Sequence, residues 1–452
     1  MAPAGLTGIL LVGGGSNRFG SPKALAPFGG ETLAERAWRT LGTVCDERIA
    51  VGKKSDGLSL PFEILDDESE IRAPLAGVVA GLRRAAHDRC VVLPVDTPLV
   101  REEHLRALAA AGGDAAVPQT GPLPGVYARS VLPELERRLR GGKLALRDAL
   151  IALDTQVVEL DRFLLANVNT PADLALAEAR ARALRAAEMV ARRQGIDGVA
   201  PAILQDWNDT IVHLRPAPIV ARVRTSWLRD NTDEPYEREL AVVSYAAARN
   251  APVVAPTRNP SPGPHHADGL VVSLWDYVEQ LAGDVPPLEA GQALRALHDA
   301  IADYPVALPS LWDRLDRAQA TTDDPSASPA LAEEDREFLA QRLRKLRSSF
   351  QQLQLPERNL HGAPHTGNLL RTSTGPRWID FDTVCRGPLE WDLAHLPEDA
   401  AAAFPETRRD ALAIARQLVG AEVAVWCWRT YGRAPEVDEA AQFHLGRLRR
   451  AE

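Results

Sequence analysis

Two cations follow a run of glycines near the start of the chain, at a spacing suited to phosphate. The segment LLVGGGSNRFGSPK contains Gly13, Gly14 and Gly15, then Arg18 and Lys23. Glycine has no Cβ and reaches positive φ, so successive backbone N–H groups can approach an anion. Arg18 can fork hydrogen bonds to phosphate oxygens, and Lys23 can bring a point charge to a phosphorus under attack. The alternative is a plain glycine turn with solvated cations, but the complete spacing favours a triphosphate site.

Two further polar groups follow apolar runs. Asp96 ends the run Val91–Val95, and Asn169 lies in NVNTPAD after FLLA. A carboxylate at the carboxyl end of a strand can hold Mg²⁺ between phosphate oxygens, and an asparagine can add a neutral oxygen. As alternatives, Asp96 could be a loop or helix-cap residue and Asn169 part of a turn before a helix near Pro171.

Composition limits the classes of function. The chain has 452 residues, a net charge of −9 and 45% hydrophobic residues, which indicates two or three globular cores and gives no electrostatic case for nucleic acid or an anionic membrane. The four cysteines show no C-x-x-C spacing and read as core thiols. No basic segment precedes the first apolar run, and no apolar stretch approaches the ~18 residues of a spanning helix, so we expect a cytoplasmic protein.

The elements that must position these residues alternate in the first part of the chain. An expected strand at 9–12 and helix at 32–41 put the glycine-rich loop at a strand's carboxyl end, where ligands of α/β sheets bind. Further strands are expected at 47–52, 62–67, 90–96 and 156–161, with helices at 75–86, 102–111 and 172–187. This alternation predicts a parallel α/β sheet in a first domain, 1–187, followed by a linker at 188–198 whose part up to Gly195 is polar and helical.

From residue 199 the pattern changes. TIVHL and IVARV predict an antiparallel pair, followed by a helix at 236–249 and strand-like runs at 253–257 and 269–278. From Pro287 onward amphipathic helices dominate, interrupted by an exposed loop at 321–329. We therefore expect a second domain, 199–452, with a small β-containing lobe to about residue 277 and a helical lobe from 278 onward.

With these motifs assembled, residues 1–187 resemble nucleotidyltransferases of the molybdenum cofactor guanylyltransferase type. The family loop L-x-G-G-x-S-x-R-x-G-x-x-K is filled in register, and Asp66-Asp67, APLAG, LPVDTPL and NVNTPAD also match. The resemblance implies a Rossmann-like, three-layer α/β domain. It assigns nucleotide binding to Leu11, Gly13, Gly14, Asp67 (or equally Asp66) and Gly77, catalysis and phosphate contacts to Arg18, Lys23 and Asp96, and Mg²⁺ to Asp96 and Asn169.

The reaction implied by the resemblance is attack of a phosphate monoester on the α-phosphorus of a nucleoside triphosphate, with release of pyrophosphate. GTP and molybdopterin are the substrates that it implies, and Gly13-Gly14 favours a purine over the alanine-glycine of many cytidyl and sugar enzymes. Pro22 stands where guanylyltransferases of this type usually carry an acidic residue. A cytidylyl or sugar-phosphate nucleotidyltransferase therefore stays open as an alternative.

The second domain resembles the aminoglycoside and choline kinase-like phosphotransferases, through HGAPHTGN and WIDFD. This implies a two-lobed, protein kinase-like α+β fold that uses ATP, with Asn368 and Asp380 holding Mg²⁺. Arg222 stands at the place of the usual phosphate-binding lysine, with Glu239 or Glu237 as its partner. Asp392 resembles the buried carboxylate that braces the catalytic loop, although it could also cap a helix.

One departure from the family pattern lies in the catalytic loop of this second domain. The family's H-G-D carries the carboxylate that accepts the proton of the reacting hydroxyl, and here that position is Ala363. Either His365 or Asp382 takes over, or the domain is a pseudokinase-type binding or regulatory module. The loop expected to cover the nucleotide, DWNDT, also contains no glycine.

Overall fold

The computed structural model describes residues 5–13, 19–225, 232–432 and 435–451. Gly14 and Arg18 lie outside the described residues. The first domain is built on a seven-stranded sheet of order β5-β4-β1-β6-β8-β7-β9. Its strands are β1 (Leu6–Leu11), β4 (Glu47–Gly52), β5 (Ile64–Asp66), β6 (Arg89–Pro94), β7 (Ala115–Pro118), β8 (Gly125–Ala128) and β9 (Thr155–Val158), and β2 (Pro27–Phe28) pairs with β3 (Glu31–Thr32) nearby.

The sheet is mixed, which corrects the prediction of a parallel one. β1 runs parallel to β4 and β6, but β8 is antiparallel to both β6 and β7. Strands β7 and β8 were not predicted from the sequence. Each has only four residues, which is too short for a hydrophobic period to stand out from the surrounding glycines and prolines.

Helices cover both faces of this sheet, as the three-layer prediction required. One face packs on α1 (Leu33–Gly42), α3 (Glu102–Ala110) and α6 (Pro171–Arg193); the other packs on α2 (Pro74–Arg84), α4 (Leu132–Arg140) and α5 (Leu146–Leu150). Successive residues of β1 alternate between the layers, because Leu10 joins the first core whereas Ile9 and Leu11 join the second. A strand buried on both faces reads as a continuous apolar run, which explains why β1 was predicted.

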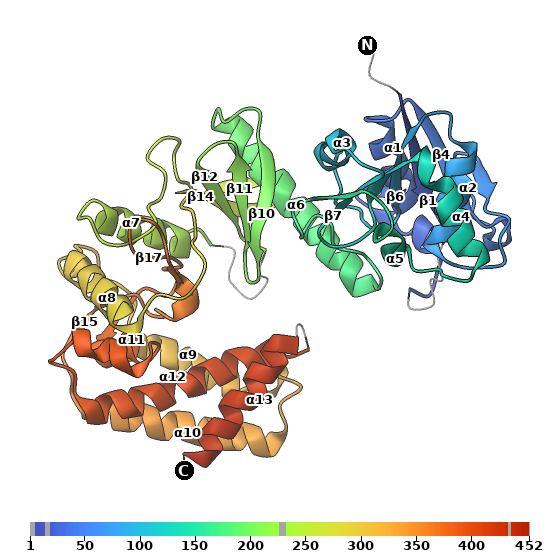
Figure 1. Ribbon diagram of the computed structural model, residues 1–452. Coiled ribbons are helices and arrows are strands. Elements are labelled where there is room, and N and C mark those ends of the chain that lie inside the picture. The colour runs from blue at the N-terminus through green and yellow to red at the C-terminus, as the bar shows by residue number, and fades with distance from the viewer. Residues whose placement is uncertain (1–4, 14–18, 226–231, 433–434, 452) are drawn as a thin grey trace.

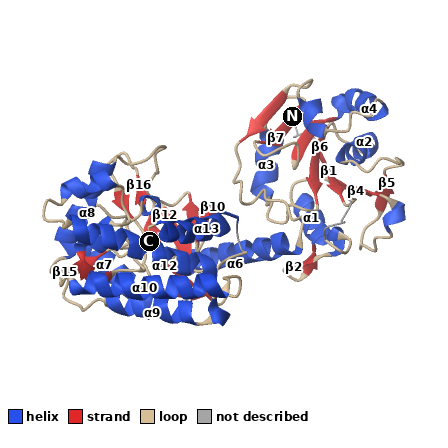
Figure 2. Cartoon of the chain, turned by 90° about the horizontal axis from the view of Figure 1, so that it is seen from below, coloured by secondary structure: helices blue, strands red, loops and turns tan. Residues whose placement is uncertain are grey.

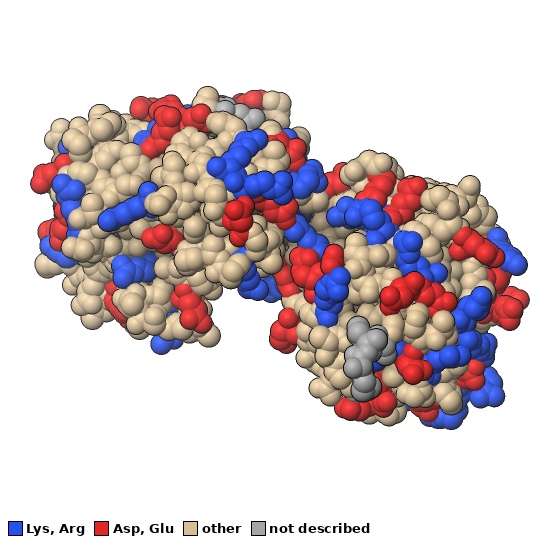
Figure 3. Space-filling view, turned by 90° about the horizontal axis from the view of Figure 1, so that it is seen from above, with Lys and Arg blue, Asp and Glu red and all other residues tan. Residues whose placement is uncertain are grey.

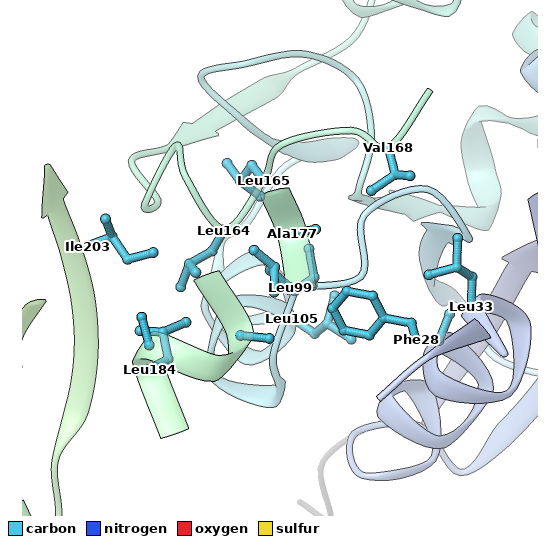
Figure 4. Packing of buried hydrophobic residues seen from close by; sticks show 14 of the residues in the cluster. Phe28, Leu33, Leu99, Leu105, Leu164, Leu165, Val168, Ala177, Leu184 and Ile203 are labelled. Atoms are coloured by element: carbon cyan, nitrogen blue, oxygen red, sulfur yellow. The ribbon is translucent and has the colours of Figure 1, made fainter. Parts of the chain in front are cut away.

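Helix α6 continues from the first domain onto the sheet of the second (Figures 1 and 2). That sheet is antiparallel, of order β10-β11-β12-β14-β13. Its strands are β10 (Ala200–Asp206), β11 (Thr210–Arg215), β12 (Ile219–Val223), β13 (His265–Ala267) and β14 (Leu270–Asp276). Figure 4 shows Leu99 and Leu105 of the first domain, Leu184 of α6 and Ile203 of β10 within one apolar cluster.

The predicted linker at 188–198 therefore begins inside a helix. Residues 188–193 are the last turns of α6, and only the short stretch after them leads into β10. Val190 and Ala191 are buried in the cluster that also holds Val212 and Leu274 of the second sheet. The boundaries of the two domains stay a prediction, but this stretch is packed rather than extended.

The rest of the second domain is mostly helical. Its helices are α7 (Glu234–Ala247), α8 (Pro287–Ile301), α9 (Leu311–Asp323), α10 (Glu333–Gln352), α11 (Leu389–Leu393), α12 (Arg409–Arg429) and α13 (Pro435–Arg450). Two small ladders pair β15 (Glu357–Leu360) with β18 (Cys385–Pro388) and β16 (Leu369–Leu370) with β17 (Arg377–Trp378). Short 3-10 helices are η1 (Lys23–Leu25), η2 (Lys54–Asp56), η3 (Arg129–Val131), η4 (Pro325–Ala327), η5 (Thr366–Asn368) and η6 (Glu398–Ala403).

Three local predictions differ from the structure. The run 253–257 is not a strand; it makes only isolated bridges, through Val253 and Pro256, because Pro252 and Pro256 lack the N–H that a ladder needs. Strand β10 was not predicted. Helix α9 reaches Asp323, so the exposed loop begins later than residue 321.

Surface and core agree with the composition. Acidic and basic side chains are interspersed on the face seen in Figure 3. Within the described residues one helix, α12, is long and apolar enough to cross a membrane by length and composition, and 61% of that window is buried inside the fold. It packs against α10 and α13 in the helical lobe.

The four cysteines are unpaired, and burial raises the pKa of Cys90 and Cys385 to about 12.

Candidate functional sites

Three of the predicted residues meet at one edge of the first sheet. The ammonium of Lys23, at the start of η1, lies 3.3 Å from Asp96 Oδ2 and 3.0 Å from Asn169 Oδ1. Asp96 follows β6 and Asn169 precedes α6, and the backbone N–H of Val168 donates to Asp96 O at 2.7 Å. The loops after β6 and before α6 are thus tied together beside Lys23.

The start of α6 fixes Asn169. Asp173 Oδ2 accepts from the backbone N–H groups of Asn169 and Thr170, both at 2.8 Å, and Thr170 Oγ1 accepts from Asp173 N at 3.1 Å. Burial alone would raise the pKa of Asp173, but these hydrogen bonds outweigh it and lower that pKa, so the carboxylate stays charged. Asp173 was missed as a contributor to the site, although T-P-A-D is a capping-box signature.

This arrangement fits a divalent cation. Asp96 and Asn169 present oxygen atoms, which Mg²⁺ prefers, toward one cation, the partly buried ammonium of Lys23. In the part of the chain that the structure describes, no group of three or more His, Cys, Asp or Glu side chains could hold a metal ion by itself. Mg²⁺ usually keeps waters and shares substrate phosphates, so two protein ligands suffice.

The predicted base-binding carboxylate lies just beyond β5. Both oxygens of Asp67 contact the ammonium of Lys53, at 2.8 and 3.1 Å. Asp66, the alternative, instead accepts from the backbone N–H groups of Lys54 and Glu68 and shapes the local turn. Lys53 was not predicted; it directly follows β4, at the same kind of strand end that indicated Asp96.

The described glycines of this site are packed against neighbours. A Cβ on Gly77 would stand 2.9 Å from Leu11 Cδ2, so the close approach of α2 to β1 requires glycine. A Cβ on Gly13 would stand 3.5 Å from the Cα of Gly52 at the end of β4. Leu11 and Gly77 therefore shape the floor of the site through packing.

The second domain is organised around Arg222 of β12. Its guanidinium donates to three carboxylates at 2.7 Å each: Nε to Asp209, Nη1 to Glu239 of α7 and Nη2 to Asp380. Asp382 Oδ2 lies 3.8 Å from Nη2. Glu239, rather than Glu237, is therefore the helix partner. We call these five residues the Arg222 cluster.

The charged groups of the Arg222 cluster strongly influence one another's pKa values. Burial alone would lower the pKa of Arg222, but the facing carboxylates, Glu239 first, hold it well above its ordinary value. Burial raises the pKa of Glu239, and Arg222 opposes that rise. Asp209 was missed by the sequence analysis, although it is one of the two acids of the glycine-free DWNDT loop.

The two predicted metal ligands of this domain, Asn368 and Asp380, are adjacent, and each is already hydrogen-bonded to another group of the protein. Asn368 donates from Nδ2 to Ala363 O at 3.1 Å, and its own carbonyl accepts from Ile379 N at 3.0 Å, which brings it beside Asp380. Asp380 has a left-handed backbone, with φ of 65°, and Arg222 holds its Oδ1. Arg222 already pairs with Asp380 Oδ1, so a divalent cation bound here would share this carboxylate with the guanidinium. Their role as metal ligands stays a prediction.

Asp392 braces the loop that contains Ala363. Its carboxylate is fully buried and accepts from the backbone N–H groups of His361 and Gly362, at 2.8 and 2.9 Å, and from His298 Nε2 at 2.8 Å. It lies inside α11, whose N-cap is Pro388, so it does not cap that helix. Burial alone would raise the pKa of Asp392, but the hydrogen bond and charge of His298 lower it.

Replacing Asp392 with alanine should lower the free energy of unfolding by about 3 kcal/mol, because two buried N–H groups lose their acceptor. Urea unfolding of the full chain measures it. Asp410, which pairs with Arg408 at the surface, offers the matched control, and its alanine variant should keep the wild-type midpoint. Equal losses in both variants would contradict a bracing role.

The fold and the two sites define a class: a nucleotidyltransferase-type α/β domain followed by a kinase-like, two-lobed domain. Comparison with known families agrees. The MobA-like NTP transferase domain matches residues 8–157, and the phosphotransferase enzyme family matches residues 202–431. The chain belongs to both families, with one domain from each.

Individual relatives cover one domain at a time. The molybdenum cofactor guanylyltransferase of Desulfosudis oleivorans is 30% identical over 40% of this chain and 98% of its own length. That of Pseudomonas putida is 35% identical over 36% of this chain and 92% of its own length. A solved choline/ethanolamine kinase family protein from Mesorhizobium loti is 17% identical, with a TM-score of 0.43 over 60% of this chain and 92% of its own.

Proposed function

We propose that the N-terminal domain transfers GMP from GTP to a small phosphate acceptor, with molybdopterin as the first candidate, and releases pyrophosphate. The observation that carries the proposal is the meeting of Lys23, Asp96 and Asn169 at the edge of the sheet. The names of the relatives, which are guanylyltransferases of the molybdenum cofactor, support the choice of nucleotide and acceptor. We place this reaction in the cytoplasm.

In the proposed reaction an oxygen of the acceptor phosphate attacks the α-phosphorus of GTP, and the bond to the β-phosphate oxygen breaks. Asp96 and Asn169 would hold Mg²⁺, which supplies charge neutralisation on the phosphates when bound. Lys23 leaves its two oxygen partners and donates to the α-phosphate as negative charge develops there. Arg18, from the glycine-rich loop, favours departure of pyrophosphate. Asp173 keeps the Asn169 oxygen in place throughout.

The proposal is tested by measuring pyrophosphate release from each of the four nucleoside triphosphates, with molybdopterin or a sugar 1-phosphate as acceptor. We expect GTP with molybdopterin to be the fastest pair. A preference for CTP or for sugar 1-phosphates would replace it by the cytidylyl or sugar-phosphate alternative. If no nucleotide is consumed and Asp96→Ala changes nothing, the proposed reaction is wrong.

For the C-terminal domain we propose a binding or regulatory role in place of efficient phosphate transfer. Ala363 offers no carboxylate to the reacting hydroxyl, Asp382 belongs to the Arg222 cluster, and Asp380 is paired with Arg222. Within this role, Arg222 is the group that would bind the phosphate of a nucleotide such as ATP. ATP-dependent phosphorylation of amino-alcohol or aminoglycoside acceptors, abolished by Asp380→Ala, would instead establish a phosphotransferase.

A further inference from the structure

One turn of the second domain contacts both the Arg222 cluster and α6, the helix that begins at the site of the first domain. Residues 206–209 connect β10 to β11, and each end of this turn carries a mostly buried aspartate. Asp209 Oδ2 accepts from Arg222 Nε at 2.7 Å, with 5% of the Asp209 side chain exposed. Asp206 Oδ2 accepts from Arg180 Nε of α6 at 2.6 Å, with 7% of the Asp206 side chain exposed. The turn is therefore held between the Arg222 cluster and α6.

Helix α6 connects this turn to the site of the first domain. Arg180 lies eleven residues after Asn169, about 16 Å along the helix axis at 1.5 Å per residue. Ala177 and Leu184, on either side of Arg180, are buried in the apolar cluster of Figure 4, so this stretch of the helix is packed in one core on both sides of Arg180. At its start, Asp173 holds the backbone of Asn169.

Asp209 accepts a hydrogen bond from Arg222 that a bound phosphate would otherwise accept. Arg222 is the cation at the predicted phosphate position. Because it already donates to three carboxylates, a phosphate that binds there has to displace one of them. Glu239 also accepts from the backbone N–H of Phe381, whereas Asp209 is held through Oδ2 and its Oδ1 has no hydrogen-bond partner among the described residues. Of the two most buried partners, Asp209 and Glu239, Asp209 therefore has fewer bonds that keep it on Arg222.

We propose that the 206–209 turn couples the two sites. A phosphate-bearing ligand that takes Arg222 from Asp209 releases the turn, weakens the hold of Asp206 on Arg180 and shifts α6, with Asn169, relative to Asp96. Asp206 and Arg180 are thus positioning residues for the nucleotidyl-transfer site. This inference rests on the proposed function of the N-terminal domain and adds its regulation by the C-terminal one.

A small movement suffices for a measurable effect. Mg²⁺ demands near-ideal octahedral geometry, and a misplacement of about 1 Å at a reacting centre can cost about 100-fold in rate. Coupling between two sites typically changes affinity by about 5- to 150-fold. The relative from Desulfosudis oleivorans is matched over 98% of its length by 40% of this chain, so it has no counterpart of the second domain. The proposed coupling therefore requires a chain that carries both domains.

A double-mutant cycle on the full chain tests the coupling. The readout is the Kd for Mg²⁺–GTP by calorimetry, and Asp67→Ala, which removes the proposed base-binding carboxylate, identifies which heat belongs to the N-terminal site. Asp209→Asn, which releases the turn from Arg222, should change this Kd about fivefold. In an Asp206→Asn background the same substitution should change it less than twofold, because the turn no longer acts on α6.

The matched control is Asp268→Asn, which removes an ion pair between the second sheet and Arg185 of α6 without touching the turn. In that background the effect of Asp209→Asn should persist. An effect of Asp209→Asn that survives Asp206→Asn unchanged, or no effect at all, overturns the inference. Absence of GTP binding by the wild type would instead overturn the proposed function. If Asp209→Asn fails to fold, Thr210→Val, which removes the hydroxyl that bonds Asp206 and Thr225, should still change the Kd.

A comparison of two ligands identifies the kind of phosphate compound that acts on Arg222. Inorganic phosphate and AMP are added separately, with EDTA present, and hydrogen exchange is followed at residues 206–210 and at Asn169 and Thr170. Faster exchange at both places with AMP alone supports a nucleotide as the ligand, and the same result with phosphate supports a simpler anion. Exchange that changes in the turn but not near Asn169, or in neither, contradicts the coupling.

Discussion

Replacing Lys23 with alanine should lower kcat for nucleotidyl transfer by about 100- to 1000-fold, while KM for GTP changes much less. The ammonium lies within hydrogen-bonding distance of Asp96 and Asn169, and we expect it to turn toward the α-phosphate as charge develops there. An interaction that strengthens only as charge develops raises kcat without tightening substrate binding. Steady-state kinetics with GTP and a saturating acceptor measure both constants.

Lys53 offers the contrasting control. It also lies at a strand end of the same sheet and pairs with a carboxylate, but with Asp67, the proposed base-binding residue. Lys53→Ala should therefore alter KM for GTP and leave kcat within a fewfold of the wild type. If Lys23→Ala raises KM as much as it lowers kcat, the lysine binds substrate and transition state equally, and the assigned role is wrong.

The meeting of Lys23, Asp96 and Asn169 could be expected from the sequence for a topological reason. Each residue follows an apolar run, and strands that run parallel end at one edge of their sheet. β1 and β6 are such neighbours, and the loop before α6 reaches the same edge through the hydrogen bond between Val168 and Asp96. Motif position therefore predicted spatial proximity, even though β7 and β8 were missed.

The partners of these residues could not be predicted in the same way. Arg222 and Asp380 are 158 residues apart, and Asp209 joins them from a turn whose only sequence signal is its acidity. Which carboxylate an arginine contacts depends on the packing of a lobe, and no local period encodes that. The same limit applies to Asp67, whose pairing with Lys53 depends on how β4 lies beside β5.

Helix α6 illustrates a further limit. Its alanine-rich repeat predicted a helix, but not that the helix is one uninterrupted element shared by two cores. Ala183 and Ala187 are small enough to let strands approach closely, so the apolar cluster continues from the first domain into the second. A linker was expected because composition becomes polar after residue 187, whereas the arginines there reach back to the second sheet, as Arg193 does to His266 O.

Replacing Arg222 with methionine should give the largest loss of stability, about 3–5 kcal/mol in the free energy of unfolding at pH 8. Its side chain is only 11% exposed, and its removal leaves the carboxylates of Asp209, Glu239 and Asp380 without their common cation. Urea unfolding of the full chain measures the loss. Arg185→Met, which breaks a half-exposed pair with Asp268, should cost at most about 1 kcal/mol.

The loss in the free energy of unfolding caused by Arg222→Met should become smaller as the pH falls. Burial already raises the pKa of Glu239 above its ordinary 4.5, and loss of the guanidinium removes the charge that opposes this rise. A carboxyl whose pKa is raised in the folded state stabilises that state when protonated, and this contribution is lost as pH rises through the folded pKa. The difference from wild type should therefore be smallest near pH 4.5 and largest at pH 8. A deficit independent of pH would mean that lost packing, and not an uncompensated carboxylate, causes it.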